Sequence, residues 1–127
     1  MEKTVNKFNP SAFKGLIDLI HSLRGNSGCP WDKRQSPASI ARYLVEEAHE
    51  LAESIDTDDS EAICAELGDV LFHIFFLAHL FEESGKFNIL DVVRSNIEKM
   101  VRRHPHVFGE SQVKNTEEIR AQWQRIK

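Results

Sequence analysis

Two pairs of acidic residues at helical spacing fall inside apolar stripes, and this placement most constrains how the chain folds. The pairs are Glu47 with Glu50 and Glu66 with Asp69. Moving an ionised carboxylate out of water costs roughly several kcal/mol even after relaxation, so carboxylates drawn toward a core need a compensating cation. No Lys or Arg occurs between Arg42 and Lys86 to supply one. A divalent metal ion is the simplest compensator.

The helical period indicates how the four carboxylates meet. A rotation of about 100 degrees per residue places Glu47 within the apolar arc of segment 38–55 and Glu50 at its edge. Glu66 and Asp69 share one stripe of segment 61–83. Two such helices packed antiparallel would bring all four carboxylates together. Oxygen ligands favour a hard ion, so we expect Mg²⁺, with Mn²⁺ as the alternative. Either pair alone is better explained as a solvated helix face or an end-of-helix charge, and only the two pairs together favour a metal site.

Every long segment has a helical period and none alternates as a strand does. The expected helices cover residues 11–24, 37–55, 61–84, 88–103 and 116–127, with a loop over 25–36. Ser36 before Pro37 is typical of a helix start, Gly85 of a helix end, and Thr116 of an N-cap. The fold class is therefore predicted to be all-α, an antiparallel bundle of four main helices with a short C-terminal tail helix.

Length and composition narrow the class of protein. At 127 residues the chain is predicted to be a single domain, 1–127. A net charge of −4 argues against a nucleic-acid partner, which requires a broad basic surface. The apolar run 70–81 is too short for a membrane span, and the N-terminus carries no apolar signal region. Cys29 and Cys64 form no C-x-x-C pattern and suit a reducing cytoplasm, where we expect the protein.

Segment 61–83 is apolar around nearly its whole circumference. Phe72, Phe75, Phe76 and Phe81 spread apolar area over several of its faces. A helix that is apolar all round is buried all round, and a chain this short hardly covers every face of it. The pattern predicts that this helix lies at the interface of a homodimer or larger homo-oligomer. The alternative is a monomeric bundle with this helix at its centre.

Basic and aromatic residues outside the core pattern are candidates for holding an anionic nucleotide. Lys99 and Arg103 lie four residues apart on one helix face, and both residue types bind phosphate oxygens. The alternative is that they are cations that a helix C-terminus favours. Trp31 in the loop and Trp123 in the tail have side chains that stack on bases, or that pack their segments onto the bundle. Lys127, four residues after Trp123, is within reach of a phosphate.

With these motifs the sequence resembles the MazG family of all-α nucleoside triphosphate pyrophosphohydrolases over nearly its whole length. The segments that carry the resemblance are GCPWD, LVEEAHEL, ELGDVLF and RRHPHVFG. The resemblance implies that the two acidic pairs are magnesium ligands. It also implies nucleotide contacts at Lys99, Arg103, Trp123 and Lys127. Glu46, which precedes a ligand, is the candidate for activating water.

The resemblance implies hydrolysis of a nucleoside triphosphate between the α and β phosphates by a water molecule activated by the metal. The chain has no G-x-x-x-x-G-K-[ST] motif, so backbone amides of a P-loop are not the expected phosphate cradle. Some members of the family carry two such domains in tandem, whereas this sequence carries one. Two alternatives stay open: hydrolysis of a phosphoribosyl-ATP-like nucleotide, and a metal-stabilised helical dimerisation module without turnover.

Overall fold

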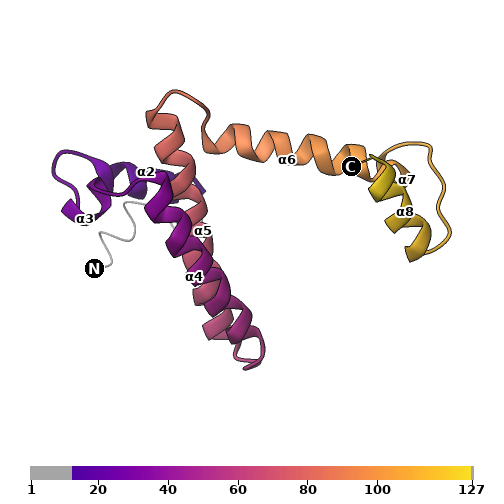
Figure 1. The fold of residues 1–127 in the computed structure, drawn as a ribbon, viewed down its shortest axis with the longest axis horizontal. Coiled ribbons are helices and arrows are strands. Elements are labelled where there is room, and N and C mark those ends of the chain that lie inside the picture. Colours follow the sequence, from indigo (N-terminus) through magenta and orange to yellow (C-terminus); the bar gives the residue numbers. More distant parts are fainter. Residues whose placement is uncertain (1–12, 127) are drawn as a thin grey trace. The chain divides into compact units, whose positions relative to one another are not determined.

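The computed structural model describes residues 13–126, and the regular structure within them is entirely helical. The helices are α2 (Phe13–Arg24), α3 (Pro30–Lys33), α4 (Pro37–Ile55), α5 (Ser60–Glu83), α6 (Ile89–Arg103), α7 (Pro105–Phe108) and α8 (Thr116–Ile126) (Figure 1). The predicted all-α class is confirmed. The chain divides into two compact units, one ending at Ile89 and one beginning at Leu90, and each is described by itself.

Helices α4 and α5 form an antiparallel hairpin that builds most of the first unit (Figure 1). Ser36 caps α4 through a capping box with Ser39, and Pro37 occupies the first turn, as the sequence predicts. Asp59 caps α5 by accepting hydrogen bonds from two backbone N–H groups of its first turn. Asp58 makes the reversal with a φ of 57°, a conformation that Asp tolerates better than most residues. Local chemistry thus fixes where α4 begins and where the chain turns into α5.

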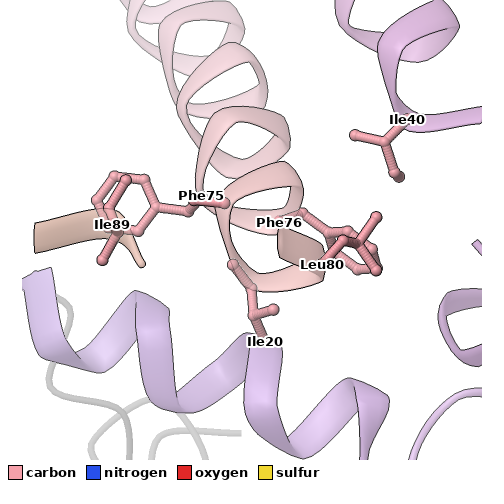
Figure 2. Close-up of a cluster of buried hydrophobic side chains, with 7 residues drawn as sticks. Ile20, Ile40, Phe75, Phe76, Leu80 and Ile89 are labelled. Carbon is pink, nitrogen blue, oxygen red and sulfur yellow. The ribbon is translucent and has the colours of Figure 1, made fainter. Parts of the chain in front are cut away.

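The buried core of the first unit lies where α2 and the start of α4 meet the C-terminal half of α5. Its members are Ile20, Ile40, Phe75, Phe76, Ala78, Leu80 and Ile89. Figure 2 shows Phe75 beside Ile89, while Phe76 and Leu80 leave α5 on another side. This core anchors one end of the hairpin. The acidic pairs lie toward the other end, beyond these apolar contacts.

Two local details differ from the sequence prediction. The expected loop over 25–36 contains the short helix α3, because Pro30 at a first helical position is already preset for helical φ. Asn115, not Thr116, caps α8, since its side-chain oxygen accepts from the backbone N–H of Glu118 at 2.9 Å. Asn is as good an N-cap as Thr, so the two assignments were nearly equivalent on sequence.

Within the first unit, α5 is not buried on every side. Leu67, Leu71 and Ile74, which share a face at helical spacing, are 53%, 39% and 39% exposed. By length and composition α5 is also apolar enough to cross a membrane, with a mean hydropathy of 1.6 in its most apolar window. It nevertheless carries Glu66 and Asp69, and a carboxylate at the centre of a bilayer costs roughly 2.5–3.5 kcal/mol. The exposed face is therefore best treated as an unpartnered protein surface.

We expect Gly28→Ala to destabilise the protein by about 1–3 kcal/mol, the usual cost of overpacking. A Cβ atom at Gly28 would lie 2.2 Å from the carbonyl oxygen of Leu23 and 2.5 Å from that of Ser22. Both clashing atoms belong to the backbone at the end of α2. A 2.9 Å hydrogen bond from the Cys29 N–H to the Leu23 carbonyl ties this backbone to the loop that contains Gly28.

Urea unfolding monitored by circular dichroism measures this loss. Gly68→Ala is the matched control: nothing lies within 4 Å of a Cβ atom placed there, and Ala is the better helix former, so this variant should lose no stability. Equal unfolding free energies for Gly28→Ala and the wild type would contradict the steric argument.

Candidate functional site

The α4/α5 hairpin brings three of the four predicted metal ligands together. One carboxylate oxygen each of Glu47, Glu66 and Asp69 can be chosen such that all three lie within 4.8 Å of one another. Glu47 comes from α4, and the other two come from neighbouring turns of α5. The antiparallel pairing of two acidic helices, expected from the spacing, is what the structure shows for these three residues.

Burial and mutual repulsion make this cluster costly without a cation. Glu47 and Glu66 are partly buried, and the Oε2 atom of each is buried with no hydrogen-bond partner. Desolvation is the main cause that raises the pKa of Glu47 above its ordinary value, followed by the nearby charges of Glu50 and Asp69. The pKa of Glu66 is raised by the same three causes in the same order. Two orphaned carboxylate oxygens beside a third carboxylate fit a hard divalent ion, which replaces the missing partners.

Glu50 and Glu46 have different places in this arrangement. Glu50 is exposed and lies outside the tight trio, yet its charge acts on both Glu47 and Glu66. It therefore borders the cluster. Glu46 is exposed on α4. The neighbourhood of Glu46 gives no support of its own to the water-activating role.

The raised pKa values predict how the metal-free protein responds to pH. The folded state keeps protons on Glu47 and Glu66 at pH values where the unfolded chain, with its ordinary pKa of 4.5, has released them. The contribution of these two groups to stability is therefore present below about pH 4.5 and is lost as the pH rises through the raised pKa values. We therefore expect the double variant Glu47→Gln/Glu66→Gln to become increasingly more stable than the wild type as the pH rises from 4.5 to about 7.5. The difference between their melting temperatures should grow over this range.

Thermal melts of both proteins in a chelator measure this gain. Glu53→Gln, an exposed position on α4, is the control and should show no such trend. Added Mg²⁺ should reverse the order of stability, because a bound cation favours the ionised carboxylates. A melting-temperature difference that stays constant with pH would contradict the prediction.

A row of aromatic rings leads from the acidic cluster to the loop. His73, one turn after Asp69 on α5, donates from Nδ1 to the Asp69 carbonyl oxygen at 2.7 Å. The centroids of the His73 and Tyr43 rings lie 6.3 Å apart, and those of the Tyr43 and Trp31 rings lie 6.0 Å apart. Trp31 is 52% exposed, so it contacts the hairpin and keeps a free face. His73 and Tyr43 were absent from the predicted site, although His73 follows Glu66 and Asp69 on the same stripe.

Arg24 holds the loop that carries Trp31. Its Nη1 donates to the backbone carbonyls of Asp32 and Lys33 at 2.7 and 3.0 Å, while its Nε donates to Glu83 Oε2 at 3.1 Å. The hydrogen bonds from Arg24 are the main reason that the pKa of Glu83 lies below its ordinary value. Sequence analysis did not single out Arg24, because a cation in the last turn of a helix is ordinary.

The second unit gathers two of the predicted nucleotide-contact residues. The central carbon of the Arg103 guanidinium lies 5.1 Å from the centroid of the Trp123 ring. The His104 and Trp123 rings contact edge to face, with centroids 5.1 Å apart. Arg103 Nε is buried with no hydrogen-bond partner. Lys99 is partly buried on α6, one turn before Arg103. The prediction for Lys127 lies outside the described residues.

Buried Gln122 fixes the turn beside this group. Its side chain lies 2.9 Å from His106 Nδ1 and also accepts a hydrogen bond from Ser111. Trp123 is half-buried. This burial supports the alternative prediction that Trp123 packs the tail helix against its neighbours. The buried Nε–H of Arg103 stays without an acceptor among the described residues.

Comparison with known proteins relates these features to one family. The sequence model described as "MazG nucleotide pyrophosphohydrolase domain" matches residues 35–108. The chain is 44% identical over 113 residues to the nucleoside triphosphate pyrophosphohydrolase/pyrophosphatase MazG of Thermotoga maritima, and 41% identical over 113 residues to the nucleoside triphosphate pyrophosphohydrolase of Escherichia coli. It is also 44% identical over 115 residues to the uncharacterized protein YabN of Bacillus subtilis.

These alignments cover most of this chain but only part of each relative. They span 87%, 88% and 91% of this chain, and 44%, 43% and 24% of the three relatives, in the order given. The chain thus spans less than half the length of these curated relatives. A crystal structure of a MazG-related protein from Thermotoga maritima superposes with a TM-score of 0.72 at 26% identity, covering 87% of this chain and 95% of that one.

Proposed function

Because the chain belongs to the MazG nucleotide pyrophosphohydrolase family, we propose that it hydrolyses nucleoside triphosphates between the α and β phosphates. Water adds to the α-phosphorus, the bond to the bridging oxygen breaks, and the products are a nucleoside monophosphate and pyrophosphate. The observation that carries the proposal is the cluster of Glu47, Glu66 and Asp69 with its two orphaned buried oxygens. An acidic cluster repels a triphosphate unless a cation lies between them.

We propose that the cation is Mg²⁺, with Mn²⁺ as a substitute. Glu47, Glu66 and Asp69 would hold it, with Glu50 as a fourth ligand. When bound, such an ion neutralises phosphate oxygens and lowers the pKa of water. The protein supplies the placement: two helices hold the carboxylates before any substrate arrives. Glu46, exposed at the edge of α4, is our candidate to accept the proton that the attacking water releases.

The remaining nucleotide contacts are assigned by charge and ring chemistry. Arg103 and Lys99, helped by Lys127, bind phosphate oxygens and offset the charge that develops on the leaving pyrophosphate. Trp123 is the ring that orients Arg103 through their 5.1 Å cation–π contact. Trp31, exposed beside Tyr43, offers a face on which a base stacks.

A panel of ribonucleoside and deoxyribonucleoside triphosphates with Mg²⁺ tests the proposal. Nucleoside monophosphate and pyrophosphate in equal amounts are the expected products, separated by ion-exchange chromatography. Release of orthophosphate would overturn the assigned bond. Turnover of a phosphoribosyl-ATP-like nucleotide alone would overturn the substrate class. Absence of any turnover, together with a Mg²⁺-dependent rise in melting temperature, would favour a dimerisation module.

We propose further that two copies of the chain associate through the exposed apolar face of the hairpin. This face consists of Val45 and Ile55 on α4 with Leu67, Leu71 and Ile74 on α5. About 100 degrees of rotation per residue turns the α5 part of this face away from Glu66 and Asp69, so association leaves the acidic cluster accessible. Gly68, beside this face, has open space around it, which suits close approach by a second helix.

Leu71→Glu is expected to weaken self-association at least about tenfold, since burying one unpaired charge at each symmetric copy costs more than 1.4 kcal/mol. Light scattering after size-exclusion chromatography over a dilution series measures it. Phe13→Glu, at a residue that is 76% exposed on α2, is the control and should match the wild type. A wild type that is monomeric at all concentrations would contradict the proposal.

We also treat the whole chain as one functional domain located in the cytoplasm. The family match over residues 35–108 includes parts of both compact units, which supports a single domain. Both cysteines are free, Cys29 partly buried and Cys64 exposed, as suits a reducing compartment. Nucleoside triphosphates are abundant in the same compartment.

A further inference from the structure

A second cluster of metal-ligating side chains lies where α2 meets the C-terminal end of α5. One ligand atom each of His21, His79 and Glu82 can be chosen such that all three lie within 4.8 Å of one another. Asp69 and His79 are ten residues apart on α5, which is about 15 Å along a helix. This cluster is therefore separate from the acidic one and has a different chemistry, with two imidazoles and a single carboxylate.

We propose that His21, His79 and Glu82 bind a borderline divalent transition metal of the zinc class, which ties α2 to α5. Imidazole nitrogen with carboxylate oxygen is a donor set that zinc prefers, whereas magnesium prefers oxygen alone. The ligand atoms of a tetrahedral zinc ion lie roughly 3.4 Å apart, given bonds of roughly 2.0–2.1 Å. The exposed side chains of His21 and Glu82 would have to rotate to close the present spacing to that value.

The buried member of the cluster has a carboxylate partner at one of its two ring nitrogens. His79 is only 8% exposed, and its Nε2 lies 3.0 Å from Glu83 Oε2, within range for the ring N–H to donate. That hydrogen bond leaves Nδ1 as the ring nitrogen with a lone pair. A ligating histidine generally donates its other N–H to a carboxylate in this way.

The surroundings leave room and charge for an ion. The cluster lines a surface hollow of about 390 Å³, which also borders Arg24 and Glu83. Arg24 pairs with Glu83 and offsets its charge, so Glu82 remains as the carboxylate for the metal. The His21 and His79 rings already contact edge to face, with centroids 4.3 Å apart. A single carboxylate among the three donors would leave a divalent ion with a net charge of about +1, open to water at a fourth position.

Zinc titration of the full-length, untagged protein by calorimetry, in excess Mg²⁺, tests this site. Mg²⁺ occupies the acidic cluster and does not compete for imidazoles. We expect saturation at a single zinc ion per chain. His21→Ala and Glu82→Gln should each weaken binding about 100-fold or more, because even the outer partners of metal ligands are worth roughly 10- to 100-fold. Both positions are exposed, so these variants avoid the folding risk of removing buried His79.

One control variant and two further measurements make the result specific. His49→Ala removes an exposed histidine of α4 outside the cluster, and it should bind zinc as the wild type does. Co²⁺ in place of zinc should give the visible absorption of a tetrahedral site in the wild type and in Glu66→Gln, but not in His21→Ala. Zinc should also raise the melting temperature of the wild type and not that of Glu82→Gln.

Equal zinc affinity in His21→Ala, Glu82→Gln and the wild type would overturn the proposal, as would the absence of saturable zinc binding in the wild type. Loss of zinc binding in Glu66→Gln would assign the ion to the acidic cluster and overturn it as well. None of these results depends on nucleotide hydrolysis, so this site and the proposed function stand or fall separately.

Discussion

Glu66→Gln is expected to lower kcat/KM for nucleoside triphosphates by about 100-fold or more at saturating Mg²⁺, while the protein stays folded. Glutamine keeps the size of the side chain but removes the charge of an oxygen that now lies buried without a partner. The outer partners of metal ligands are already worth roughly 10- to 100-fold in affinity or activity, and a direct ligand should be worth at least that.

The same change should not lower the stability of the metal-free protein. Desolvation and the charges of Glu50 and Asp69 raise the pKa of Glu66, so its ionised form opposes folding near neutral pH. Pyrophosphate release and a thermal melt in chelator measure the two effects side by side. Glu53→Gln on α4 is the matched control, with wild-type turnover expected. Wild-type turnover by Glu66→Gln would remove this residue from the site.

Phe76→Ala is expected to lower the free energy of unfolding by about 3–5 kcal/mol, the usual cost of truncating a buried Phe. Phe76 is fully buried, at 0% exposure, and packs against Phe72 with ring centroids 5.8 Å apart. The Arg24 guanidinium lies over the Phe76 ring at 5.9 Å. Because single domains are stable by only roughly 5–15 kcal/mol, this one truncation removes a large share of the margin.

Chemical denaturation in urea measures the loss, with Phe13→Ala as the control. Phe13 is 76% exposed, so its truncation should change stability by no more than about 0.5 kcal/mol. The variant Phe76→Leu, which keeps most of the apolar volume, should fall between the two. Similar losses for Phe76→Ala and Phe13→Ala would show that the α2/α5 contact is not the centre of the fold.

Arg24 connects this packing to the candidate site. It contacts the Phe76 ring, pairs with Glu83 and holds two carbonyls of the segment that includes Trp31. The core of the first unit therefore also sets the position of the loop. Mutations at Phe76 should affect the placement of Trp31 as well as stability, which is why activity measurements on core variants need the stability control beside them.

The helices, and the acidic pair that each of the two hairpin helices presents, followed from local patterns. Capping at Ser36, the stop at Gly85 and the i, i+3 spacing of Glu66 and Asp69 depend on residues within one or two turns of each other. Hydrogen bonds and rotation per residue act over that range, and so the sequence alone carries them. The same patterns identified Glu47 as the odd charge on an apolar arc.

Contacts between distant segments were decided only by the tertiary structure. That Glu50 borders the trio rather than joining it, that Arg24 reaches the carbonyls of Asp32 and Lys33, and that His21 meets His79 all depend on the relative register of separate elements. Register between helices comes from side-chain packing summed over many weak contacts, and no short stretch of sequence encodes that sum. Residue spacing determined which groups each helix presents, and packing determined which of them meet.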